Sequence, residues 1–121
     1  MSMESELFDA LKGLVANRVY PSVAPEAAST PYVTWQVTGG QATNFLEGVQ
    51  PSKKNARIQL SVWSKSLEEA LQIGQQAETV LRARVALSTT VQTGQLTRYE
   101  PETRLHGTYQ FFSCWADISN T

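Results

Sequence analysis

The segment from Ala56 to Leu81 constrains the fold most, because its hydrophobic period changes from two to about 3.6 within a few residues. Its first part alternates apolar and polar residues, with Ile58, Leu60 and Val62 on one side. That pattern predicts a strand with one face in a core. Its second part has apolar residues at helical spacing, at Leu67, Ala70, Leu71, Gly74, Ala77, Val80 and Leu81. A strand followed directly by an amphipathic helix is therefore expected.

The junction between these two elements carries a capping box, formed by Ser66 and Glu69. In such a box the serine hydroxyl accepts a hydrogen bond from the backbone N–H three residues later, and the glutamate carboxylate reaches back to the serine N–H. We therefore expect the helix to begin directly after Ser66.

The remaining pattern predicts a helix over Glu4–Asn17 and an extended crossing from Pro21 to Pro31. Further strands are predicted over Tyr32–Thr38, Val91–Tyr99 and Leu105–Asp117, with a long loop over Gly39–Asn55 and a turn over Glu100–Arg104. This order predicts an α+β fold in which residues 1–121 form a single domain. Two helices pack on one face of a small, mostly antiparallel sheet of about four strands, and the long loop joins strands one and two.

Composition narrows the function classes. Of the 121 residues, 41% are hydrophobic and 17% charged, which is typical of an ordered globular chain. Ten basic and eleven acidic residues give a formal charge of −1, which argues against a free-standing nucleic-acid binder. No apolar run approaches the roughly 20 residues of a membrane span. Cys114 is the only cysteine, so neither an intramolecular disulfide nor a cysteine-based zinc site is expected.

Residues for catalysis are not grouped in this sequence. His106 and Cys114 lie eight residues apart on one predicted strand, roughly 26 Å from each other, which is too far for a nucleophile and its base. Glu68 and Glu69 are adjacent on a helix and diverge. The pair Gly39-Gly40 lacks the lysine of a phosphate-binding loop. We therefore predict no enzyme, no cofactor, no metal and no catalytic residue.

Two sets of residues in and beside the long loop are candidates for contact with a partner. Lys53 and Lys54 form the one basic clump, which serves either to keep a strand edge soluble or to contact DNA or an anionic protein. Phe45 and Leu46 stand among polar neighbours, either as an anchor on their own domain or as a contact for another subunit.

Two tryptophans form the third candidate set. Trp63 directly follows Val62, and Trp115 directly follows Cys114. Adjacent residues of a strand point to opposite faces of the sheet. If Val62 and Cys114 face the helices, both tryptophans lie on the other face of the sheet. Two helices leave that face without a cover, so we expect it to be buried by neighbouring subunits or by another protein. The alternative is that one of the two rings completes the domain's own core.

At this point the sequence resembles a known family, the tail-completion proteins of long-tailed bacteriophages and prophages, also called head–tail joining or tail-terminator proteins. The matching pieces run in order through nearly the whole chain: Leu7–Leu11, Val19–Pro25, Pro31–Trp35, Ala56–Ala70, and Tyr99–Thr103 followed by Phe112–Trp115. The chain departs from the family pattern at Gly107, inside the last strand, and in the polar segment Ser88–Gln95.

The resemblance implies a structural virion protein without catalysis. Relatives of this kind form a ring, usually a hexamer, that caps the tail tube and joins it to the head connector. The implied partners are further copies of the chain, the tail-tube protein and the head-connector proteins, with DNA close by in the ring lumen. The implied location is the virion, after synthesis in the host cytoplasm. A second hypothesis is a small monomeric or dimeric protein-binding module that uses the Trp63 and Trp115 face.

Overall fold

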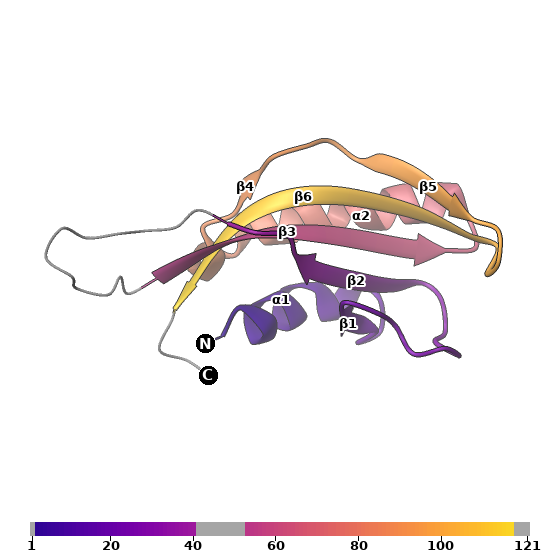
Figure 1. The fold of residues 1–121 in the computed structure, drawn as a ribbon, viewed down its shortest axis with the longest axis horizontal. Helices are drawn as coiled ribbons and strands as arrows, with labels where there is room; N and C mark the ends of the chain where they lie inside the picture. Colours follow the sequence, from indigo (N-terminus) through magenta and orange to yellow (C-terminus); the bar gives the residue numbers. More distant parts are fainter. Residues whose placement is uncertain (1, 41–52, 118–121) are drawn as a thin grey trace, which may run out of the picture.

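The computed structural model describes residues 2–40 and 53–117. In chain order the elements are α1 (Met3–Leu11), η1 (Lys12–Leu14), β1 (Val19–Pro21), β2 (Tyr32–Val37), β3 (Lys53–Ser64), α2 (Leu67–Ala83), η2 (Val85–Leu87), β4 (Thr90–Val91), β5 (Leu96–Glu100) and β6 (Leu105–Asp117), where η marks a 3₁₀ helix. The long strands β3 and β6 pair along their whole length at the centre of the sheet (Figure 1).

The sheet has six strands in the described residues, in the order β1-β2-β3-β6-β4, with β5 also paired to β6. All pairs are antiparallel except β1 with β2, which run parallel. The predicted α+β class with a mostly antiparallel sheet is confirmed, and the count of four strands is wrong. The difference comes from β1, which lies between the predicted first helix and the predicted extended crossing and shares only Pro21 with that crossing, and from a break in the predicted strand Val91–Tyr99.

The extra strand β1 has a tertiary cause. It has only three residues and ends in a proline, so its sequence carries no alternation to recognise. It is held by β2: the Val33 N–H donates to the Arg18 carbonyl at 2.9 Å, and the Ser22 N–H donates to the Trp35 carbonyl at 2.7 Å.

The break between β4 and β5 also has a tertiary cause. Gln95 turns toward α2, where its side-chain amide donates to the Leu71 carbonyl at 3.2 Å. Gln110 of β6 donates to the Thr93 carbonyl at 2.9 Å. These contacts with α2 and β6 replace a continuous edge strand.

Several boundaries differ from the prediction. The first helix ends at Leu11 and continues as one 3₁₀ turn, because Ala16 and Asn17 take positive φ angles of 51° and 69° and reverse the chain. The second strand begins at Lys53, inside the predicted loop, where Lys53 and Lys54 pair with Asp117 and Ala116 of β6.

Both α-helices cover the same face of the sheet (Figure 1). The residues buried between the layers come from the two helices and from alternate positions of β2, β3 and β6: Leu7, Leu11, Val33, Ile58, Leu60, Val62, Ala70, Ala77, Leu81, Phe112 and Cys114. Val37 has the same strand parity as the buried Val33 and Trp35, but it is 57% exposed at the end of β2.

The N-terminus of α2 confirms half of the predicted capping box. The Ser66 hydroxyl accepts a hydrogen bond from the Glu69 N–H at 3.3 Å. The Glu69 carboxylate does not reach the Ser66 N–H, because the buried Ser64 stands between them. Ser64 donates its hydroxyl proton to Glu69 and accepts from the Ser66 N–H at 3.2 Å. The last residue of β3 thus fixes the start of α2.

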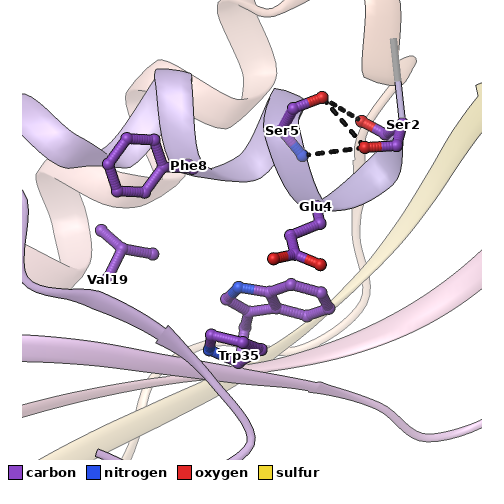
Figure 2. A pocket seen from close by; sticks show the side chains of 7 residues that line it. Ser2, Glu4, Ser5, Phe8, Val19 and Trp35 are labelled. Carbon is purple, nitrogen blue, oxygen red and sulfur yellow. Dashed lines mark hydrogen bonds between the residues drawn. The ribbon is translucent and has the colours of Figure 1, made fainter. Parts of the chain in front are cut away.

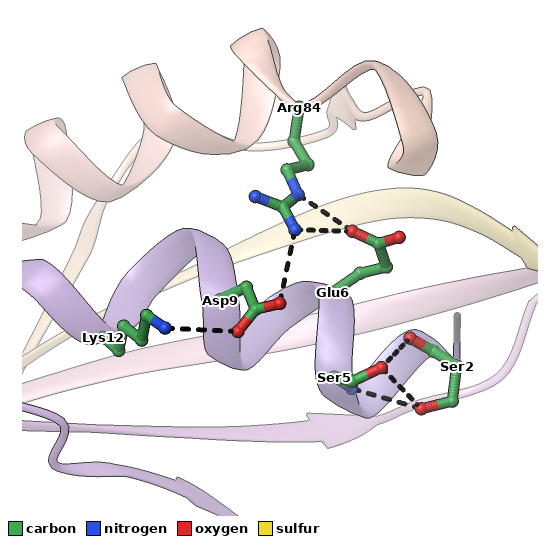
Figure 3. Close-up of polar contacts among 6 residues, drawn as sticks. All are labelled: Ser2, Ser5, Glu6, Asp9, Lys12 and Arg84. Atoms are coloured by element: carbon green, nitrogen blue, oxygen red, sulfur yellow. Dashed lines mark hydrogen bonds and ion pairs between the residues drawn. The ribbon is translucent and has the colours of Figure 1, made fainter.

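An ion pair joins the start of the chain to the end of α2 (Figure 3). Arg84 donates from Nε and Nη2 to the same oxygen of Glu6, each at 2.8 Å, and its Nη2 lies 3.7 Å from Asp9. Because Glu6 is buried, losing Arg84 leaves a desolvated carboxylate without its partner. The pair holds α1 against α2 on the covered side of the sheet.

Candidate subunit and partner interface

The face of the sheet opposite the two α-helices is the candidate site, and we call it the open sheet face. Since Leu60 and Val62 point to the helices, the alternate residues of β3 point the other way. The residues of β6 that pair with them in register lie on the same side of the sheet. The open sheet face comprises Arg57, Gln59, Ser61 and Trp63 of β3 and Gly107, Tyr109, Phe111, Ser113 and Trp115 of β6.

Trp63 lies flat against the backbone of β6. Its register partner is Gly107, and a Cβ atom at Gly107 would stand 2.7 Å from the nearest carbon of the Trp63 ring. A side chain at position 107 would therefore collide with the indole. The glycine that interrupts the strand pattern of the sequence is the residue that lets a large ring rest on the sheet.

Phe111 and its neighbours form the centre of the open sheet face. Its ring meets that of Tyr109 edge to face, with centroids 6.2 Å apart. The guanidinium of Arg57 stands 4.2 Å from the Phe111 centroid, within the range of a cation–π contact. Arg57 Nε also donates to Gln92 at 2.8 Å, which fixes its orientation.

The β1–β2 side of the sheet carries a further aromatic pair. Tyr20 and Tyr32 meet edge to face at 6.0 Å. Burial raises the pKa of the Tyr32 hydroxyl, and Glu100 and Tyr20 add to the shift by repulsion of the phenolate. Tyr32 therefore stays neutral near pH 7. Rings thus extend across the sheet from β1 to β6.

The predicted interface residues have different positions. Trp63 of β3 and Trp115 of β6 are both half-buried on the open sheet face, but they stand at opposite ends of the β3–β6 pair and do not meet. Lys53 and Lys54 are exposed at the start of β3. Phe45 and Leu46 lie outside the described residues.

Sequence reasoning missed Tyr109 and Phe111, which occupy the face between the two tryptophans. Both stand an even number of residues from Trp115 on β6, so the alternation of side chains along a strand would have been enough to put them on the same face.

The third tryptophan has a different environment. Trp35 is 9% exposed and points to the helix side, where it lines a groove of about 320 Å³ between α1 and the β1–β2 edge. Phe8 and Val19 form the apolar wall of this groove, and Glu4 lies beside the indole (Figure 2). A tryptophan in this chain is therefore not by itself evidence of an interface.

Cys114 and His106 lie in separate surroundings within the described residues. Cys114 is fully buried beside Thr89, and this burial raises the pKa of its thiol. His106 packs against Tyr99 with ring centroids 4.9 Å apart. Within residues 2–40 and 53–117, no group of three or more His, Cys, Asp or Glu residues could hold a metal ion. No helix in the same residues is long and apolar enough to cross a membrane.

Comparison with known families decides the class of protein. The family model described as tail completion protein gp17 matches residues 6–117, almost the whole described fold. The chain belongs to this family. This tail completion protein is therefore a phage structural protein and not an enzyme, and its place is in the virion.

Comparison with solved structures supports the fold. A chain of the virion of a native gene transfer agent particle superposes with a TM-score of 0.55 at 11% sequence identity, covering 96% of this chain and 95% of that one. At this identity the likeness concerns the fold alone. No curated protein matches the tail completion protein in sequence.

Proposed function

We propose that this tail completion protein forms a ring that caps the phage tail tube and joins it to the head connector. Membership of the family establishes a phage structural role, and the open sheet face is the observation that supports the ring. A closed ring needs a heterologous contact, in which one patch of a subunit meets a different patch of the next. The described fold offers such a patch in a row of aromatic rings that its own helices do not cover.

The composition of the open sheet face suits a protein contact. Trp63, Tyr109, Phe111 and Trp115 are half-buried, so a partner would complete their burial at little cost in side-chain ordering. Aromatic residues and arginine are enriched at interface centres, where truncation of an anchor typically costs about 2 kcal/mol or more. We assign Trp63 and Trp115 to the contact between subunits or with the tail.

The loop residues have a different role in this proposal. Phe45 and Leu46 are proposed to contact a neighbouring subunit or the tail tube. Lys53 and Lys54 stand exposed at the start of β3. They are proposed to contact an acidic partner surface or the DNA that passes through the ring.

The test is complementation of a phage that lacks this gene. We expect the wild-type chain to restore joined particles, with density for a ring between tail tube and connector in electron micrographs. The Trp63→Ala variant is expected to fold and to leave heads and tails unjoined. Joined particles without a ring at the junction would overturn the proposal. If the chain instead bound another protein as a monomer or dimer, that result would favour a binding module that uses the same face.

A further inference from the structure

We propose that the open sheet face of one copy is covered by the outer side of α2 of the next copy. This inference rests on the proposed ring and names its second patch. The outer side of α2, called here the α2 outer face, is the side turned away from the sheet. It comprises the exposed residues Glu68, Gln72, Gln75, Gln76, Thr79 and, at its C-terminal end, Arg82, which pairs with Glu78.

The α2 outer face is unusually poor in charge at its centre. The outward side of a helix that meets only water is normally rich in Lys, Arg, Asp and Glu. Here three glutamines and a threonine fill the middle of a 17-residue helix. Depletion of charge at the centre of a patch is the compositional mark of a buried interface.

The open sheet face has a matching polar pattern. Beside the aromatic rings, the Gln36 amide of β2 donates to the Gln59 amide of β3 at 3.2 Å. This bond leaves donors and acceptors of both amides unused. Glutamine side chains on a covering helix could satisfy them while their methylene groups pack on the rings.

The charges at the margins of the two patches are complementary. Arg98 of β5 pairs in register with Gly107, which places it on the side of Trp63, and it is exposed. Glu68 begins the α2 outer face. Neither residue has an ion pair within the described residues. An α2 outer face laid on the sheet can bring Glu68 of one copy to Arg98 of the next.

Symmetry separates this arrangement from a sheet-to-sheet contact. The two patches lie on opposite layers of the molecule, so the contact is heterologous and repeats from copy to copy until the ring closes. Two open sheet faces stacked on each other would be isologous and would stop at a dimer.

The test is thiol cross-linking of the full-length chain on purified tails with a short bifunctional maleimide. Ser61→Cys places a thiol on the open sheet face, and Gln75→Cys places one on the α2 outer face. The wild type, whose only thiol is the buried Cys114, is the background control. Glu26→Cys, exposed in the segment between β1 and β2, is the matched control for a surface thiol elsewhere.

The expected result is specific to a front-to-back contact. The Ser61→Cys/Gln75→Cys double variant should give a ladder of dimers, trimers and larger species up to the ring. Each single variant alone should give less than a tenth of that cross-linked product, and an equal mixture of the two single variants should give cross-linked products without the full ladder.

Other outcomes overturn the inference. Cross-linked dimers from Ser61→Cys alone would show sheet-to-sheet contact. A cross-link from Ser61→Cys to the tail-tube or connector protein would show a different occupant. Joined particles with a visible ring and no ladder would refute the α2 contact while the ring stands. Absence of any ring in the wild-type particles would instead refute the proposed function.

Discussion

The two faces of the β3–β6 ribbon differ although the same two strands make both. Ile58, Leu60 and Val62 of β3 share the helix side with Phe112 of β6, and all four are at most 2% exposed. On the other side, Trp63, Tyr109 and Phe111 are at least as large as Phe112 but only half-buried. Size and apolar character therefore do not decide which face becomes the core. The position of the helices does, and it leaves these rings available for another molecule.

The largest expected loss of stability comes from a substitution on the helix side of the sheet. Phe112→Ala should cost about 3–5 kcal/mol in the free energy of unfolding, because it opens a cavity among fully buried neighbours. Thermal unfolding should show a loss of at least about 10 °C in Tm. The adjacent Phe111→Ala, on the open sheet face, is the matched control and should cost less than half as much. Equal losses in both variants would break the contrast between the two faces.

The second effect concerns the open sheet face itself. Trp63→Ala should keep a folded subunit and weaken assembly by about 2 kcal/mol or more, since aromatic anchors dominate interfaces. Trp115→Ala should act in the same direction. Trp35→Ala, on the helix side, is the control and should lower Tm more than either. Thermal melts combined with the complementation assay separate these results. A large loss of stability with assembly intact would mean that Trp63 belongs to the subunit's own core.

A smaller loss of stability is expected from a substitution at Gly107. Gly107→Ala should destabilise the subunit by about 1–3 kcal/mol, because the added methyl group collides with the Trp63 ring. The double variant Gly107→Ala/Trp63→Ala should recover most of this loss. Chemical denaturation of the single and double variants measures the coupling between the two sites. If the two losses simply add, the indole does not rest on the glycine.

The smallest effect is a pH dependence on the helix side. Gln110 donates to Glu78 at 2.7 Å, and this hydrogen bond lowers the pKa of the carboxyl below its ordinary value of 4.5. Because the folded-state pKa is the lower one, Glu78 contributes stability above pH 4.5, and this contribution is lost as the pH falls through the folded-state pKa. Glu78→Gln should therefore flatten the acid side of the stability curve. A control variant at the exposed Glu26 should leave it unchanged.

The sequence pattern was enough to predict those elements whose periodicity or cap lies within a few residues. The bounds of β6, Leu105–Asp117, match the prediction, and α2 begins directly after Ser66 as expected. Strand parity correctly placed Val62 and Cys114 toward the helices, with Trp63 and Trp115 opposite. In each case the period or cap lies within a few residues, where backbone geometry alone relates side chains to faces.

Other features depend on distant partners. The strand β1 exists because β2 supplies its hydrogen bonds, and β3 extends back to Lys53 because the end of β6 lies beside it. No window of sequence around these residues contains the neighbour that decides their state.

By itself, then, the sequence determined the period change after β3, the start of α2, the parity of the tryptophans and the family. Only the tertiary structure decided that Trp35 faces the helices, that Trp63 rests on Gly107, and that Tyr109 and Phe111 complete the open sheet face. The physical reason is that periodicity is a property of one segment. Burial depends on which other elements of the chain pack against that segment, and here both α-helices pack on the same side of the sheet.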